Sequence, residues 1–471
     1  MAKFDYDIAV IGGGSAGLTA AYTASALKKK VVIIEKDRLG GECTWTGCVP
    51  SKALLKVAKV AYQSQHASKY GIINDCRVDM SGVMDYVHSV QKEIYKEETP
   101  EVLRAEGIEV LIGKAEFIDS KTFTVGQDKF RAEKIIVATG SSPVIPPIEG
   151  IEDVSYLTNQ TLFGLEKLPE SLLIIGGGPI GVEMAQALNR LEVEIKLVQR
   201  GNRILKKEEP ALSEALADML CQEGVELLTG YEAVKIEEEN EIILTVSSGG
   251  GKKVLKAEKV LVAAGRKANT DGFNLDKLGV EIGRQGLITD AKMQTNLSNI
   301  YACGDVVGPY RFSHISYHEG ITAAINAILP LPIKKMDYDN VLWVTYTDPE
   351  LAHLGLTENE ARDRYGDSIK IYNLSYSELD RAMTDGEKGQ AKFISDKRGN
   401  LLGAHILGAR AGEIIHSCQI VKTMGIPFKK LQSVIHSYPT YSEIVRDGAK
   451  EAYIGDWEAR LELINKLAWW K

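Results

Sequence analysis

The sequence of 471 residues lacks an excess of positive charge and any short repeat of glycine and proline. It has 56 lysines and arginines against 64 aspartates and glutamates, a net charge of −8. We therefore expect no general affinity for nucleic acid or anionic lipid. The 44 glycines and 14 prolines follow no short period, which excludes a collagen, and an apolar share of 44% excludes a wholly disordered chain. A chain of this length folds as several globular domains.

Long hydrophobic runs and cysteines are also scarce. No stretch reaches the roughly 18 consecutive apolar residues of a membrane span. The N-terminus lacks the basic and apolar regions of a secretory leader, so we expect a cytoplasmic protein. Six cysteines are too few for a disulfide-stapled scaffold. Cys43 and Cys48 are the two that lie close together in the sequence, and cysteine chemistry is expected there.

A glycine-rich motif occurs twice, at a spacing of 164 residues between Gly12 and Gly176. Each copy follows a short apolar run and precedes a helical pattern, as a buried parallel strand and its helix require. Such glycines permit a tight turn, let the backbone approach a pyrophosphate and let the helix pack on the strand. Two incidental glycine-rich turns would not explain why residues 134–140 and 259–265, downstream of the two copies, also match. We therefore predict an α/β fold with two tandem doubly wound dinucleotide-binding domains.

The two motifs also supply candidate cofactor contacts. We expect the helix that follows each motif to direct its positive N-terminus at the phosphates. The candidates are Gly12, Gly14, Ser15, Ala16 and Gly17 in the first copy, and Gly176, Gly178, Ile180 and Gly181 in the second.

The residue that ends the second strand of each unit indicates which cofactor binds. Glu35 stands 18 residues after Gly17, and a carboxylate at this place hydrogen-bonds ribose hydroxyls. Gln199 stands 18 residues after Gly181, where a carboxylate would repel a 2′-phosphate. Three basic residues follow it: Arg200, Arg203 and Lys206. We predict FAD in the first site and NADPH in the second, with NADH possible if this loop does not discriminate.

The two clustered cysteines lie in a segment that also contains Gly40-Gly41, Gly47 and Pro50. Within a regular helix, Cys43 and Cys48 would stand about 7.5 Å apart along the axis. This exceeds the roughly 7 Å that a disulfide spans between α-carbons, so a bridge needs a distorted turn, which Gly47 permits. Pro50 favours a helix start, which places Cys48 near its positive end and stabilises a thiolate. A zinc site is the alternative, but no second Cys/His pair stands at ligand spacing, and we predict no metal.

Together these residues resemble the pyridine nucleotide–disulfide oxidoreductase family of dihydrolipoamide dehydrogenase, glutathione reductase and mercuric reductase. The resemblance covers nearly the whole chain. The motifs that carry it are the two glycine motifs, Cys43-x4-Cys48 with Pro50-Ser51-Lys52, Ala138-Thr139-Gly140, Cys303-Gly304-Asp305 and residues 436–443.

The resemblance implies a redox-active disulfide between Cys43 and Cys48. Cys43 would face the substrate and Cys48 the flavin, with Lys52 near the flavin ring and paired with Glu183. The C-terminal domain would form a homodimer in which Tyr438 lies over the cysteines of the partner. Further implied cofactor contacts are Lys36, Gly41, Lys52, Ala115, Thr139, Gly140, Glu183, Gly265, Asp305 and His314.

The expected domains follow from the same resemblance and from a change of pattern near residue 337. Residues 1–148 would form the first part of the FAD-binding domain, and 149–270 the NAD(P)-binding domain. Residues 271–336 would complete the FAD-binding domain, and 337–471 would form an α+β dimerisation domain. We expect the terminal Trp469-Trp470 to belong to a helix with an aromatic face that packs on the partner subunit.

One position departs from the thiol-reducing members of the family. They carry a histidine directly before the proline that corresponds to Pro439, and a glutamate five residues after the histidine holds it. Here Tyr438 takes the histidine position, while Glu443 is kept. A tyrosine with a pKa of about 10 is a poor base at neutral pH, whereas histidine titrates at about 6.5. We predict an NADPH-dependent reductase whose acceptor needs little acid–base help: a soft metal ion such as Hg(II), a quinone or a small electrophile. The alternatives are a dihydrolipoamide dehydrogenase that uses His436 as base, and a redox-sensing flavoprotein with little turnover.

Overall fold

The computed structural model describes residues 4–468, which form two compact units. The first comprises the chain up to Gly176 with Leu191–Glu194 and Ala233–Asp337; the second comprises Gly177–Arg190, Ile195–Glu232 and the chain from Tyr338 onward. Each unit is described by itself. Trp469 and Trp470, the expected aromatic helix end, lie outside the described residues.

The first unit is built on a seven-stranded sheet. Its strand order is β3-β2-β1-β6-β5-β4, and β16 pairs with β6. The parallel members are short apolar runs, and all five residues of β2 are buried, as a sheet covered on both faces requires. The strands are β1 (Tyr6–Ile11), β2 (Val31–Glu35), β3 (Ile108–Ile112), β4 (Ala115–Asp119), β5 (Thr122–Val125), β6 (Asp128–Val137) and β16 (Ile300–Ala302).

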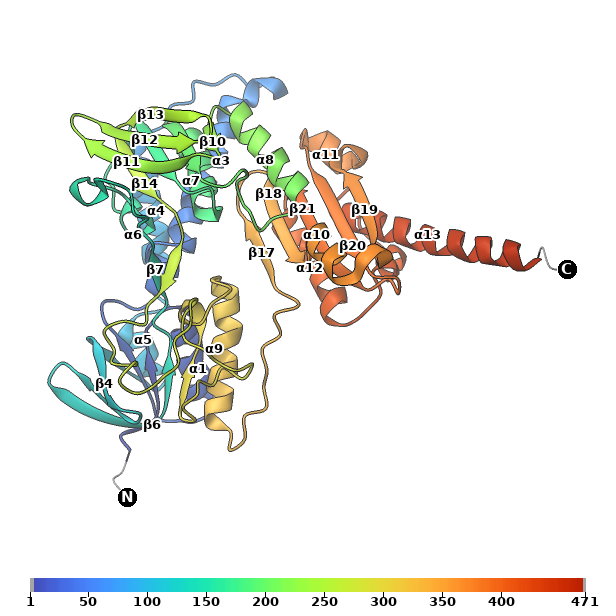
Figure 1. Ribbon diagram of the computed structural model, residues 1–471. Coiled ribbons are helices and arrows are strands. Elements are labelled where there is room, and N and C mark those ends of the chain that lie inside the picture. Colours follow the sequence, from blue (N-terminus) through green and yellow to red (C-terminus); the bar gives the residue numbers. More distant parts are fainter. Residues whose placement is uncertain (1–3, 469–471) are drawn as a thin grey trace. The chain divides into compact units, whose positions relative to one another are not determined.

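Two helices of this unit, α1 (Ser15–Ala26) and α9 (Ser313–Ile328), lie side by side (Figure 1). Their close approach requires glycine, because a Cβ on Gly320 would stand 2.6 Å from the Ala16 carbonyl oxygen. The other helices of the unit are α2 (Gly41–Trp45), α3 (Cys48–Gln65), α4 (Met80–Tyr95), α5 (Pro100–Ala105) and α6 (Asn159–Leu162).

Smaller sheets complete the first unit. Strand β8 (Ser171–Ile175) pairs in parallel with β14 (Lys259–Val262), and β7 (Ser141–Pro143) pairs antiparallel with β15 (Arg266–Ala268). Three antiparallel strands form a further sheet: β11 (Glu232–Glu238), β12 (Ile242–Ser248) and β13 (Gly251–Ala257). The predicted strand, glycine turn and helix therefore occur at the first motif as β1 and α1, and at the second as β8 and the following helix α7 (Pro179–Asn189).

The second unit contains parallel strands β9 (Glu194–Gln199) and β10 (Glu226–Thr229) and helix α8 (Pro210–Gln222). It also contains an antiparallel sheet of order β17-β18-β21-β20-β19, which confirms the predicted α+β character after residue 337. Its strands are β17 (Leu342–Thr345), β18 (Glu350–Gly355), β19 (Lys370–Ser375), β20 (Gln390–Ser395) and β21 (Leu401–Gly408). The helices around it are α10 (Glu358–Tyr365), α11 (Asp380–Asp385), α12 (Ala411–Thr423) and α13 (Glu443–Ala468).

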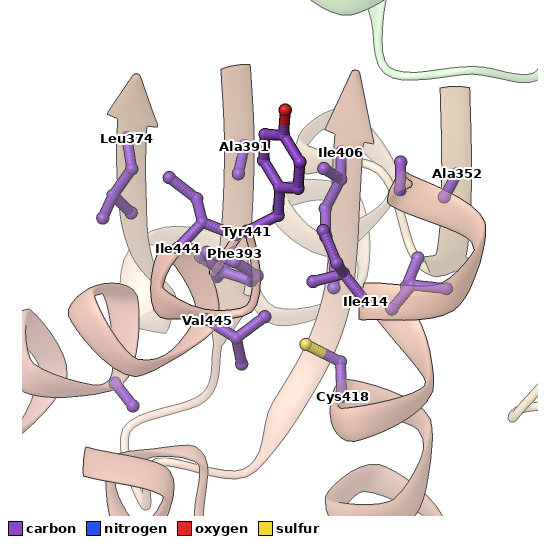
Figure 2. Close-up of a cluster of buried hydrophobic side chains, with 14 of the residues drawn as sticks. Ala352, Leu374, Ala391, Phe393, Ile406, Ile414, Cys418, Tyr441, Ile444 and Val445 are labelled. Atoms are coloured by element: carbon purple, nitrogen blue, oxygen red, sulfur yellow. The ribbon is translucent and has the colours of Figure 1, made fainter. Parts of the chain in front are cut away.

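The core of this α+β part lies between the sheet and two helices. Figure 2 shows Cys418 of α12 and Val445 of α13 beside strands that carry Phe393 and Ile406. All eight residues of β21 are buried, so this central strand is covered on both faces. The first turn of α13 is thereby fixed by packing, together with Tyr441 just before it. Within residues 4–468, no helix is both long and apolar enough to cross a membrane.

Candidate active site

The two clustered cysteines sit on either side of a break between helices. Helix α2 ends at Trp45 and α3 begins at Cys48, so the predicted distorted turn is present. A Cβ on Gly47 would lie 2.8 Å from the Glu42 carbonyl oxygen, and this close approach requires glycine. Cys48 is the first residue of α3, where the helix dipole stabilises a thiolate.

The sulfur atoms of Cys43 and Cys48 are hydrogen-bonding neighbours, and both residues are thiols in the structure. A third group, the hydroxyl of Ser313 at the start of α9, contacts both sulfurs. Its Oγ lies 3.2 Å from Cys43 Sγ and 3.3 Å from Cys48 Sγ. Sequence analysis did not single out Ser313; its one signal was its place directly before His314, in a segment already expected near the flavin.

Contact with Cys48, followed by burial, raises the pKa of the Cys43 thiol above its ordinary value. Hydrogen bonds from the Ser313 and Ser15 hydroxyls act in the opposite direction. Deprotonation of one sulfur therefore disfavours deprotonation of the other, and the pair titrates as a unit. Cys48 is exposed and Cys43 is half-buried in the single chain, so the assignment of one sulfur to substrate and the other to flavin stays a prediction. Among residues 4–468, no group of three or more histidine, cysteine, aspartate or glutamate side chains is arranged to hold a metal ion.

The first glycine motif adjoins the cysteine helix. Gly12 has a φ of 109°, and a Cβ there would lie 2.2 Å from the Ala138 carbonyl oxygen. Gly41 begins α2 so close to Gly14 that an added Cβ would stand 2.7 Å from the Gly14 Cα. An added Cβ on Gly14 would be in ordinary van der Waals contact with the Gly41 Cα, at 3.8 Å, and Gly14 precedes the start of α1, where helix N-termini bind phosphates.

Two side chains at matching positions hold the glycine turns in the two motifs. Glu35 Oε2 accepts a hydrogen bond of 2.7 Å from the Gly13 amide, and Gln199 Oε1 accepts one of 2.9 Å from the Gly177 amide. Gln199 in the second motif thus makes the same hydrogen bond to its glycine turn as Glu35 makes in the first, but carries no negative charge. An added Cβ on Gly178 would meet nothing within 4 Å, so the second turn is also open to a phosphate. These cradles and their donor sets fit the two dinucleotides; contact of Glu35 with a ribose stays a prediction.

The basic residues after Gln199 differ in what they contact. The Arg200 side chain is 81% exposed and lies 3.5 Å from Glu232. The Arg203 guanidinium instead donates back to the carbonyl oxygens of Lys206, at 3.0 Å, and Glu208, at 3.4 Å. Arg200 is therefore exposed beside Glu232, whereas Arg203 contacts its own loop, and binding of a 2′-phosphate by either residue stays a prediction.

Other predicted FAD contacts meet in a polar network of the first unit. Thr139 Oγ1 donates to the Asn269 carbonyl oxygen at 2.7 Å, and Ser141 Oγ donates to Asp305 Oδ2 at 2.6 Å. His314, exposed on the first turn of α9, stacks on Phe312 with ring centroids 5.5 Å apart. The remaining candidates are placed as follows: Lys36 is exposed, Lys52 and Gly41 are half-buried, Ala115 is buried at the start of β4, and Gly265 has a φ of 131°.

In the second unit, Tyr438 and Glu443 take the positions expected for a catalytic histidine and its glutamate. They do not form a proton-accepting pair. Tyr438 is 70% exposed, and its hydroxyl donates to Asp380 Oδ2 at 2.5 Å. This hydrogen bond and the Asp380 charge raise the pKa of the phenol above its ordinary value. Glu443 is buried and accepts from the Thr440 amide at 3.1 Å and from Arg446 at 2.7 Å. The Glu443 carboxylate thus hydrogen-bonds groups at the start of α13.

Two further predicted catalytic residues have local partners. Glu183 is buried on α7, and its Oε1 accepts from the Tyr346 amide at 2.8 Å. His436 Nδ1 lies 2.9 Å from the Val434 carbonyl oxygen. The expected pairing of Lys52 with Glu183 joins residues of different units and stays a prediction.

Comparison with known proteins agrees with this arrangement. The model of the pyridine nucleotide-disulphide oxidoreductase family matches residues 6–329, and its dimerisation domain matches residues 341–449. A mercuric reductase of Lysinibacillus sphaericus is 34% identical over 93% of this chain and 81% of its own length. A dihydrolipoyl dehydrogenase of Thermus scotoductus is 33% identical over 94% of this chain and 97% of its own.

A solved structure is similar as well. It is the Cu(II) complex of the HOCl-induced flavoprotein disulfide reductase RclA from Escherichia coli, with a TM-score of 0.83, 27% identity, and coverage of 93% of this chain and 98% of that one. Relatives and family models together span the cysteine segment, both glycine motifs and the α+β domain. The chain therefore belongs to the pyridine nucleotide–disulfide oxidoreductases, enzymes that depend on FAD and take electrons from NAD(P)H.

Proposed function

We propose that the chain is an NADPH-dependent reductase of an acceptor that requires no protein base, with a soft metal ion as the leading acceptor class. The observation that carries this proposal is the Tyr438 phenol, which donates a hydrogen bond to Asp380 where thiol-reducing relatives place a histidine. With its pKa raised, this phenol accepts no proton near neutral pH. The mercuric reductase relatives support the same acceptor class.

Bound FAD would supply the hydride acceptor between the nicotinamide and the sulfur pair. The first glycine turn, with Gly12 and Gly14, would hold its pyrophosphate, and Asp305 and Thr139 would orient it. The second turn, with Gly178, would hold NADPH, and Arg200 would bind the 2′-phosphate. NADH is then the weaker donor.

The chain's own sulfur chemistry begins with the Cys43–Cys48 disulfide. Two electrons break the sulfur–sulfur bond, one sulfur takes a proton and the other stays a thiolate. The Ser313 hydroxyl, within 3.3 Å of both sulfurs, stabilises that thiolate by hydrogen bonding. Reduction of a disulfide substrate would also need a proton for the leaving thiolate, which the Tyr438 site does not exchange at neutral pH. A thiolate-bound soft metal ion takes up electrons without that proton.

The acceptor assignment is tested by steady-state turnover of the holoenzyme with NADPH. We expect kcat/KM for Hg(II), supplied as a thiol complex, to exceed that for lipoamide by at least about 100-fold, the usual worth of a general base. Efficient turnover of dihydrolipoamide with NAD would instead assign the chain to the second candidate, dihydrolipoyl dehydrogenase, which the Thermus relative favours. Slow oxygen consumption with every acceptor would contradict both and favour a redox sensor.

The family's dimerisation domain over residues 341–449 supports a homodimer. We propose that each active site is shared, with Tyr438 of one subunit over the partner's Cys43. The proposed domain boundaries are those expected from the sequence: 1–148 and 271–336 for FAD, 149–270 for NADPH, and 337–471 for the interface.

A further inference from the structure

Helix α2, which carries Cys43, also carries Glu42, whose carboxylate contacts distant segments of the first unit. Glu42 Oε1 accepts a hydrogen bond of 2.7 Å from Gln160 Nε2. Its Oε2 forms an ion pair with the Arg266 guanidinium and lies 3.5 Å from Asn159 Nδ2. Asn159 also donates to the carbonyl oxygen of Thr46, in the turn between the two cysteines, at 3.2 Å. Glu42 therefore ties α2 to α6 and to Arg266.

Arg266 extends this contact toward the predicted flavin site. Its side chain is 15% exposed, its Nε donates to Ser141 Oγ at 2.7 Å, and a second nitrogen donates to the Ser141 carbonyl oxygen at 2.8 Å. Ser141 Oγ donates to Asp305 Oδ2 at 2.6 Å, and Arg266 Nε itself lies 3.8 Å from the same oxygen, so Asp305 is a second negative partner of Arg266. The Arg266 carbonyl oxygen accepts a further hydrogen bond of 2.6 Å from Arg311. A continuous polar chain thus links the helix of Cys43 to Asp305.

We infer that Glu42 is a positioning residue for the redox couple. Its ion pair with Arg266 fixes α2, and with it Cys43 Sγ beside Cys48, while it balances the positive charge of the Arg266 guanidinium. The inference rests on the proposed role of Cys43 and Cys48 as the redox couple. Loss of the carboxylate would leave the Arg266 charge less balanced, and an unbalanced positive charge favours the thiolate.

A second carboxylate, Glu98, contacts the same helix from another segment and provides a matched control. Glu98 Oε2 accepts a 2.8 Å hydrogen bond from Thr44 Oγ1, a neutral donor on α2, and burial raises the pKa of Glu98. Glu98→Gln thus changes an anchor of α2 without exposing an arginine charge. Glu42→Asp provides a conservative variant that keeps the negative charge.

The experiment is an anaerobic dithionite titration of the FAD-loaded enzyme, with the long-wavelength thiolate–flavin absorbance followed against pH. In Glu42→Gln we expect the pH midpoint of this band to fall by about one unit. Glu98→Gln and Glu42→Asp should keep the wild-type midpoint. The double variant Glu42→Gln/Arg266→Gln should return toward wild type, because both charges are then removed.

Equal midpoints in Glu42→Gln and wild type would overturn the inference, as would equal shifts in Glu42→Gln and Glu98→Gln. The titration needs no acceptor, so its result does not depend on the acceptor assignment. Absence of the band in the wild-type enzyme would instead contradict the proposed redox couple. If Glu42→Gln fails to retain FAD, Glu42→Asp is compared with the double variant instead. A lower pH midpoint of the band in Glu42→Asp, which keeps the negative charge, than in the double variant would contradict the inference.

Discussion

At the level of single residues, the Ser313 hydroxyl lies within 3.3 Å of the sulfur atoms of both Cys43 and Cys48. Ser313→Ala removes a donor that stabilises the thiolate, so the pKa governing thiolate formation should rise by about one unit. Iodoacetamide alkylation rates of the reduced enzyme, measured against pH, check this shift. Ser313→Thr, which keeps the hydroxyl, is the control; a profile unchanged in Ser313→Ala would show that this hydroxyl does not stabilise the thiolate.

Arg200 provides a residue-scale test of cofactor preference. Arg200→Ala should lower kcat/KM for NADPH by about tenfold, the worth of one charge-assisted contact to phosphate. NADH, which lacks the 2′-phosphate, serves as the internal control and should change little. Equal losses with both cofactors would mean that Arg200 supports the loop rather than the phosphate.

Some of these residues could be anticipated from the sequence and others could not. Short sequence patterns were enough to predict the roles of Cys43, Cys48 and the glycine motifs. Ser313 is 265 residues from Cys48, and its role depends on how α9 packs against α1. Glu42 lies beside Cys43, yet its ion pair with Arg266 arises only when distant segments meet.

At the scale of elements, the break between α2 and α3 decides whether the two sulfurs meet. Gly47→Ala would place a Cβ 2.8 Å from the Glu42 carbonyl oxygen. We expect a loss of about 1–3 kcal/mol in stability, typical of overpacking, together with slower closure of the disulfide. Chemical denaturation and thiol quantification after oxidation measure both effects.

Gly249→Ala is the matched control, because an added Cβ there meets nothing within 4 Å. A Gly47→Ala enzyme as stable and as readily oxidised as the control would contradict the need for glycine in this turn.

The elements themselves were largely predictable. Short apolar runs in the sequence form the parallel strands β1, β2, β8 and β14, because strands covered on both faces need continuous apolar sequence. The partner of Tyr438 was not predictable: Asp380 starts α11, a six-residue helix whose place beside the tyrosine is set by the packing of the α+β domain.

At the scale of the whole molecule, helix α13 continues beyond residue 449, where the match to the family's dimerisation domain ends. Large apolar residues recur on this extension at spacings of three and four, as in a coiled-coil seam. They are exposed in the single chain, and they are Ile454, Trp457, Leu461 and Ile464. Because the extension continues from the dimerisation domain, we propose that the partner subunit covers them.

Deletion of residues 453–471 should therefore raise the dissociation constant of the homodimer by at least about tenfold, since burial of a large apolar side chain contributes about 1.5–3 kcal/mol. Sedimentation equilibrium measures this constant. Glu462→Lys, a change outside the apolar seam, should leave it within about threefold. An unaltered dissociation constant after the deletion would show that the extension has another role.

Anaerobic reduction of the FAD-loaded enzyme by NADPH measures whether electrons reach the Cys43–Cys48 couple. We expect a long-wavelength thiolate–flavin band in the wild-type enzyme, two new thiols per chain, and loss of the band in Cys48→Ser. Reduction of the flavin without the band and without new thiols would contradict this expectation.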